Sequence, residues 1–173
     1  MGRKKRILIL GVGNVLLKDE GLGVRALEYL KNTRSIPGSV TLVDGGVNGL
    51  TLLSVMEGYN PVMIIDAVRG GGPPGSVYRL GKEKIAGRGI RGWKERLSSL
   101  HGLGMEEVLA ALTVYGEKKE VVIIGMEPLQ VSPGMALSPL VSRRLRLVVE
   151  LIVDELARLG VKLKKRKDAK GLL

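Results

Sequence analysis

The sequence contains no cysteine among its 173 residues. This absence excludes disulfide bonds, a catalytic thiolate and any zinc site built from cysteine ligands. Phenylalanine is also missing, and aromatic residues make up only 3% of the chain. Because 45% of the residues are still hydrophobic, we expect a sizeable core packed from Leu, Val, Ile, Met and Ala. The length fits one domain of the common size, about 100–200 residues.

The sequence also lacks a long apolar run. No stretch approaches the roughly 18 consecutive apolar residues that a membrane span needs. The basic segment at residues 1–6 has the charge of a signal-peptide start. However, the apolar run behind it, from Ile7 to Leu10, is too short for a signal core. We therefore expect a soluble, cytoplasmic protein without a membrane span.

Acidic residues are outnumbered, and the formal net charge is +11. The excess is concentrated in residues 82–96, with six basic and two acidic residues, and 162–173, with six basic and one acidic residue. Because no apolar face continues beyond Leu163, we expect one domain over residues 1–160 and a basic, flexible tail over 161–173. Contact with RNA, an acidic partner or a membrane surface is the alternative interpretation of this charge. Nucleic acid is not the expected partner.

Short β-rich runs alternate with helical patterns along the chain. This alternation predicts a parallel or mostly parallel sheet with helices on both faces. The segment 81–97 is glycine-rich and basic, and we interpret it as a long loop or partial helix. The expected strands are 6–11, 40–44, 61–66, 76–80 and 120–125, and the expected helices are 20–32, 50–57, 105–115 and 139–159.

Several residues indicate where helices begin and end. Asp19 is expected to cap the first helix, with Glu20 in its first turn. Ser138 is expected to cap the last helix and Pro139 to occupy its first turn. Gly160 is expected to end that helix.

Polar residues follow the predicted strands, at the carboxyl ends where ligands bind in folds of this kind. Glu20 follows the first strand, Asp44 ends the second and Asp66 ends the third, while the single histidine, His101, lies in a predicted loop. Two carboxylates and an imidazole suit a divalent metal ion, with coordination positions left open. Each residue also has a structural interpretation, as a charge near a helix start, a turn former or a surface cap.

A nucleotide site is not supported. Gly11 and Gly13 follow a strand as in the dinucleotide fingerprint, but that pattern needs a third glycine where the sequence has Leu16. Asp19 and Glu20 would also place negative charge where a pyrophosphate should bind. The sequence has no Walker loop either. We interpret the two glycines as a tight turn between a strand and a loop.

Five segments carry a further pattern, and they follow one another in a fixed order. They are 11–24 (GVGNVLLKDEGLGV), 44–49 (DGGVNG), 64–67 (IIDA), 99–101 (SLH) and 125–141, which contains Leu-Ser-Pro. Together they closely resemble the nickel-iron hydrogenase maturation proteases, and the likeness covers roughly residues 6–158. The chain departs from that family by Val47, where threonine is usual, and by its basic 81–97 segment and tail.

The resemblance implies a three-layer α/β/α sandwich around a mostly parallel, five-stranded sheet. It also implies an endopeptidase that removes the C-terminal extension of a hydrogenase large-subunit precursor after nickel insertion. The family's metal-contacting residues correspond to Glu20, Asp66 and His101. Nickel is then supplied by the precursor and is not a permanent cofactor.

Other details stay open at this level. Asp44 is expected to orient a ligand or to position substrate, and Gly45 and Gly46 to let a peptide approach the backbone. Hydrolysis through the metal ion and hydrolysis through a carboxylate base are both compatible with the residues. The segment 81–97, which includes Trp93, is either a docking element or a solvated loop. The alternative functions are a peptidyl-tRNA hydrolase-like esterase and a non-catalytic nickel chaperone.

Overall fold

The structure, a computed structural model, describes residues 6–47, 49–81 and 119–166. Within these ranges a sheet of five strands runs in the order β3-β1-β4-β6-β5, and every neighbouring pair is parallel except β6 with β5. This confirms the mostly parallel sheet. The strands are β1 (Ile7–Val12), β3 (Val40–Gly46), β4 (Val62–Ala67), β5 (Val77–Leu80) and β6 (Val121–Met126).

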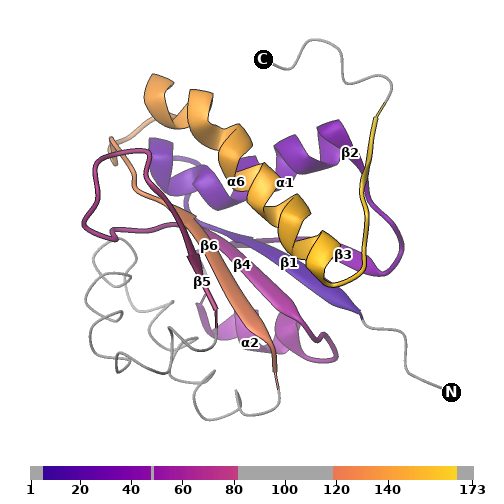
Figure 1. Cartoon of the computed structure of the whole chain (residues 1–173). Helices are drawn as coiled ribbons and strands as arrows, with labels where there is room; N and C mark the ends of the chain where they lie inside the picture. The colour runs from indigo at the N-terminus through magenta and orange to yellow at the C-terminus, as the bar shows by residue number, and fades with distance from the viewer. Residues whose placement is uncertain (1–5, 48, 82–118, 167–173) are drawn as a thin grey trace, which may run out of the picture.

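Helices cover both faces of this sheet. The described helices are η1 (Lys18–Gly21), α1 (Leu22–Thr33), α2 (Gly49–Met56) and α6 (Pro139–Arg158). Figure 1 shows α1 and α6 on one face and α2 on the other, which confirms the three-layer arrangement. None of the helices in the described ranges is both long and apolar enough to cross a membrane.

The sheet divides the core into two clusters because side chains alternate along each strand. Ile7 and Ile9 of β1 pack in the cluster under α1 and α6, whereas Leu8 and Leu10 pack in the cluster with α2. The central strands β1, β4 and β6 are buried at every residue, as their continuous apolar sequences predict.

The helix ends agree only in part with the expected caps. Helix α1 begins at Leu22, after the separate short helix η1, and its N-cap residue is Gly21. The prediction that Asp19 caps this helix is therefore wrong, and Glu20 lies in η1. The start of α6 at Pro139 is confirmed, as is its end just before Gly160, whose φ angle is +85°.

The beginning of the predicted tail is attached to the fold. Val161 and Leu163 pack against the core, and β7 (Lys164–Lys165) pairs antiparallel with β2 (Arg34–Ser35). These contacts attach residues 161–166 to the domain, and the flexibility of the tail stays a prediction. The rest of the predicted tail, the helix 105–115 and nearly all of segment 81–97 lie outside the described residues.

Asp19 does not cap α1 but joins η1 to the segment that connects β6 with α6. Its fully buried carboxylate accepts hydrogen bonds from the backbone N–H groups of Leu129 (3.0 Å), Gln130 (2.8 Å) and Ser138 (2.6 Å). It also accepts one from the Ser138 hydroxyl (2.8 Å), so this hydroxyl does not cap α6. Four donors offset the cost of removing the carboxylate from water.

A second buried carboxylate joins the edge strand β5 to α6. Glu155 accepts two hydrogen bonds from Arg79, one from Nε (2.7 Å) and one from Nη2 (2.8 Å). A third comes from Arg158 (3.1 Å). The Arg79 guanidinium beside Glu155 holds the pKa of this carboxyl below its ordinary value. Bidentate arginine pairs of this kind combine charge with fixed geometry.

Asp19→Asn should destabilise the fold. The substitution keeps the side-chain size but turns one acceptor oxygen into a donor that faces other donors. We expect the free energy of unfolding to fall by on the order of 3 kcal/mol, measured by urea denaturation. Ser138→Ala is the matched control, because it removes one donor of the four and should cost about 1 kcal/mol. A variant Asp19→Asn as stable as the wild type would contradict this role.

Glu155 should make the protein acid-sensitive. Because its pKa is lower in the folded state, its contribution is present above the ordinary pKa of 4.5 and is lost as the pH falls through the folded-state value. We expect Glu155→Gln to unfold more easily at pH 7, by about 1–3 kcal/mol. The difference from the wild type should shrink as the pH is lowered to about 3 in a series of urea titrations. A difference that does not change with pH would refute the assignment.

Candidate functional site

The start of α1 rests directly on the carboxyl ends of β1 and β4. A Cβ atom at Gly23 would lie 2.2 Å from the carbonyl oxygen of Ile65 and 2.3 Å from that of Val12. A Cβ atom at Gly13 would lie 1.8 Å from the carbonyl oxygen of Glu20. Only glycine permits either approach, since real Cβ contacts are far longer. These two contacts fix where Glu20 lies.

Glu20 and Asp66 are both buried, and they lie on adjoining segments. Their exposed fractions are 4% and 1%. Cα atoms of η1, which carries Glu20, lie within 8 Å of Cα atoms of β4, which carries Asp66. Oε2 of Glu20 and Oδ2 of Asp66 are both shielded from solvent. The structure thus brings two of the three predicted metal-contacting residues to one edge of the sheet.

Asp66 lies on the α2 face of the sheet. Ile64 and Val68 belong to the cluster on that face, whereas Ile65 and Ala67 belong to the opposite cluster. Oδ1 of Asp66 accepts a hydrogen bond from the N–H of Ala67 (2.8 Å), which orients the carboxylate at the end of its strand. Strand β6 adds no side chain directly beside it, because the β6 residue in register is Gly125.

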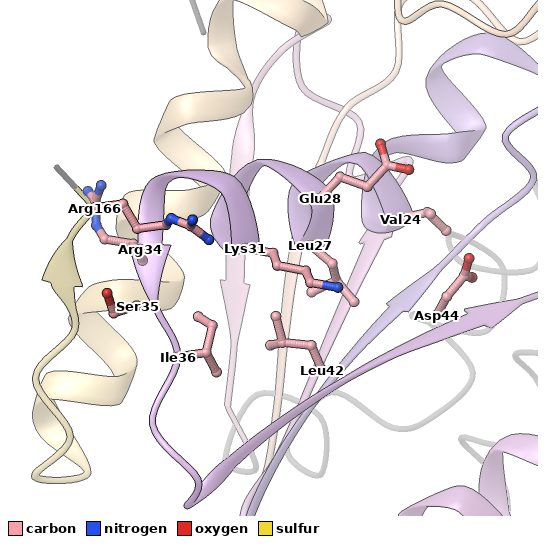
Figure 2. A pocket seen from close by; sticks show the side chains of 10 residues that line it. All are labelled: Val24, Leu27, Glu28, Lys31, Arg34, Ser35, Ile36, Leu42, Asp44 and Arg166. Carbon is pink, nitrogen blue, oxygen red and sulfur yellow. The ribbon is translucent and has the colours of Figure 1, made fainter. Parts of the chain in front are cut away.

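Asp44 lies on the α1 face of the sheet, opposite to Asp66. It is exposed and lies at one end of a pocket of about 510 Å³ between α1 and β3 (Figure 2). Arg34 and Arg166 lie at the opposite end of that pocket. Asp44 and Asp66 are also two strands apart, about 10 Å across the sheet. This placement favours substrate positioning over the orientation of a metal ligand.

The two glycines after Asp44 differ in their surroundings. A Cβ atom at Gly45 would lie 2.8 Å from Leu52 Cδ2 and 3.0 Å from Leu10 Cδ1, so packing against α2 accounts for this glycine. Gly46 has a φ angle of +53° and open space around its Cα atom, and its N–H donates to Asp44 Oδ1 (2.9 Å). Close approach of a peptide therefore remains a prediction that concerns Gly46 more than Gly45.

The sequence interpretation missed Glu127, which follows β6 at the same edge. Its Oε2 accepts hydrogen bonds from the N–H of Gly70 (2.7 Å) and the hydroxyl of Tyr78 (2.8 Å). Burial, reinforced by the bond to Glu127, raises the pKa of Tyr78 above 10.0, so its hydroxyl stays a donor at neutral pH. These bonds hold the loop that follows Asp66. An acid immediately after a continuous apolar strand was the signal available in the sequence.

His101 lies outside the described residues. Among the residues that are described, no three Asp, Glu or His side chains are grouped so that they could hold a metal ion. A third carboxylate or imidazole ligand beside Glu20 and Asp66 would have to come from His101 or another residue beyond the described ranges. The role of His101 stays a prediction.

Comparison with known proteins gives a consistent result. The sequence model of a family described as hydrogenase maturation protease matches residues 24–155. The hydrogenase 2 maturation protease of Escherichia coli is 35% identical over 158 residues, which is 90% of this chain and 93% of that protein. The hydrogenase expression/formation protein HupD of Thiocapsa roseopersicina is 34% identical over 94% of this chain and 73% of its own length.

Solved structures agree with the sequence comparisons. The hydrogenase maturating endopeptidase HybD from E. coli superposes with a TM-score of 0.82 at 33% identity, covering 94% of this chain and 99% of that one. The maturation protease HycI from Thermococcus kodakarensis superposes with a TM-score of 0.68 at 25% identity, covering 88% and 93%. These findings favour a peptidase over the esterase and chaperone alternatives. The chain belongs to the hydrogenase maturation protease family and is a peptidase.

Proposed function

We propose that this peptidase removes a C-terminal extension from the large-subunit precursor of a nickel-iron hydrogenase after nickel has been inserted. The observation that carries the proposal is the pair of buried carboxylates, Glu20 and Asp66, on adjoining segments at the carboxyl edge of the sheet. Family membership supplies the reaction class, and this pair supplies a place for a cation. The cytoplasmic location stays a prediction of the sequence.

In this proposal the nickel ion belongs to the precursor. Glu20, Asp66 and His101 would fill coordination positions that the precursor leaves open. Carboxylate oxygens buried in a low-dielectric environment attract a divalent cation more strongly than they would in water. A precursor without nickel would lose these ligand bonds, so the protein would reject it. The pair therefore acts as a check on nickel insertion.

Hydrolysis adds water to the carbonyl carbon of the scissile peptide bond, breaks its C–N bond and leaves a proton on the released amine. The precursor's own ion could polarise the carbonyl oxygen. Alternatively, Glu20 or Asp66 could accept the proton of the attacking water. Asp44 lies at a pocket on the face of the sheet opposite to Asp66. From there it could contact the polypeptide that flanks the cleaved bond.

Removing either buried carboxylate should abolish processing. Glu20→Gln and Asp66→Asn keep the size of each side chain but remove the charge and the basic oxygen. We expect the cleavage rate of nickel-loaded precursor to fall by about 100-fold or more for each variant. The rate is read from the mass of the large subunit over time. Asp154→Asn, an exposed acid on α6, is the control and should cleave normally.

Nickel in the precursor should decide whether cleavage occurs. We expect the wild-type protein to shorten nickel-loaded precursor and to leave nickel-free precursor intact, both measured by mass spectrometry. Adding nickel to the protease alone before mixing should not replace loading of the precursor. Equal cleavage of the two precursors would contradict the proposed check. Binding without cleavage of either would instead indicate a chaperone.

A further inference from the structure

The pocket between α1 and β3 has charges of opposite sign at its two ends. Its volume is about 510 Å³, and apolar side chains of both elements line the part between the ends. Figure 2 shows Glu28 and Asp44 at one end, Arg34 and Arg166 at the other, and Lys31 extending between them. We call Lys31, Arg34 and Arg166 the pocket cations. Apart from Asp44, no residue of this pocket has a part in the proposed function.

The pocket cations come from two segments far apart in the chain. Lys31 lies in the last turn of α1 and Arg34 directly follows this helix, whereas Arg166 follows β7. Pairing of β7 with β2 brings Arg166 to the pocket, and its backbone N–H donates to Thr33 O (3.0 Å). Cations are common at the C-terminus of a helix because they offset the helix dipole. The helix end does not account for a further cation brought by the segment after β7.

The surroundings of the pocket cations leave them with a positive potential. Arg34 is only 8% exposed, and its guanidinium donates to Glu150 Oε1 (2.9 Å), which holds it in place. Glu150 offsets part of the charge, but it does not line the pocket. Among the described residues that do line it, the acids are Glu28 and Asp44, at the far end. An anion in the pocket is therefore attracted to one end and repelled from the other.

The pocket has the dimensions of a site for a short chain segment. Val24 and Arg34 both line it, and at about 1.5 Å of helix rise per residue they are about 15 Å apart along α1. An extended chain of about four or five residues spans this length. Within the described ranges β3 pairs with β1 alone, so one side of its backbone is open to an extended chain.

The acidic end of the pocket lies nearer to the candidate site. Asp44 is at the same edge of the sheet as Asp66, about 10 Å away across two strands. A chain that leaves the cleaved bond would reach Arg34 after about eight residues or more. The precursor continues into folded protein before this bond, which is too large for the pocket. After the bond it continues only as the extension, which ends in a carboxylate.

We propose that the pocket binds the C-terminal extension of the precursor along β3, with a carboxylate of the extension at the pocket cations. This carboxylate is either the end of the chain or an acidic side chain. The inference rests on the proposed function and deepens it by naming the part of the substrate that is held. The opposite charges also set the direction of the extension, because the reverse direction would place its carboxylate beside Glu28 and Asp44.

The test compares charge inside the pocket with equal charge outside it. The pocket variant combines Lys31→Gln with Arg166→Gln. The matched control combines Lys162→Gln with Lys165→Gln, two exposed lysines of the C-terminal segment that do not line the pocket. The probe is a synthetic peptide that runs from the residue after the cleaved bond to the end of the precursor. By calorimetry we expect its Kd to rise about fivefold or more in the pocket variant and to stay at the wild-type value in the control.

Processing of the intact precursor gives a second measurement. With nickel-loaded precursor we expect KM to rise in the pocket variant while kcat changes by less than about twofold, because the pocket cations do not touch the cleaved bond. Lys31→Arg combined with Arg166→Lys keeps both charges and should retain the wild-type Kd and KM. Urea unfolding midpoints should be unchanged throughout. If the double variant unfolds, the single variant Lys31→Gln decides by the same criteria, since this side chain is exposed.

The Kd of the peptide decides the outcome. An unchanged Kd in the pocket variant would overturn the proposal. So would an equal rise in the control, which would assign the effect to the overall charge of the protein. Absence of peptide binding to the wild type would overturn it as well.

Two modified peptides identify the carboxylate. One ends in an amide, and the other has Asn and Gln in place of its Asp and Glu. The peptide that lacks the bound carboxylate should bind the wild type about fivefold more weakly. Weaker binding of the amide assigns the chain end, and weaker binding of the other assigns an acidic side chain. Undiminished affinity of both would contradict the proposal.

The inference and the proposed function fail separately, because binding of the peptide requires neither nickel nor cleavage. If the wild type leaves nickel-loaded precursor intact but binds the peptide through the pocket cations, the proposed function fails and the assignment of the pocket stands. If the wild type cleaves the precursor and the peptide does not depend on the pocket cations, only the assignment of the pocket fails.

Discussion

The buried carboxylate of Asp19 is the interaction on which the arrangement of this edge of the sheet depends. It accepts hydrogen bonds from three backbone N–H groups and one hydroxyl, all from residues 129–138, more than a hundred positions away in the sequence. Because the next residue is Glu20, whatever fixes Asp19 also fixes the candidate site. One acid of the adjacent pair is committed to structure, and the other is the candidate for chemistry.

The same edge separates acidic residues by role. Asp19 and Glu127 hold connecting segments in place, through four and two hydrogen bonds among those described. Glu20 and Asp66 are buried on adjoining segments, where a cation brought by another molecule would be strongly attracted. Asp44 is exposed beside a pocket, on the face of the sheet opposite to Asp66.

The close contact of α1 with the strand ends explains how a small sheet presents this pair. Gly23 allows the helix to rest on the carbonyl oxygens of Ile65 and Val12, so η1 is held beside β4 without any intervening side chain. A larger residue at this position would push Glu20 away from Asp66. Hydrogen bonds also join the segments around them, from Gly134 N–H to Leu16 O and from Gly13 N–H to Gly46 O.

The sequence alone determined the sheet, its mostly parallel direction and the position of Asp66 at a strand end, because continuous apolar runs and their alternation with helical patterns are local signals. It also carried the family pattern. Only the tertiary structure decided that Asp19 binds residues near α6 instead of capping α1, that Asp44 and Asp66 face opposite sides of the sheet, and that Lys164 and Lys165 pair with β2. The first and last of these are contacts between residues far apart in the chain, and each uses backbone groups, which every residue possesses and no sequence pattern marks. The faces of Asp44 and Asp66 depend on the register between strands, which is set only when the sheet forms.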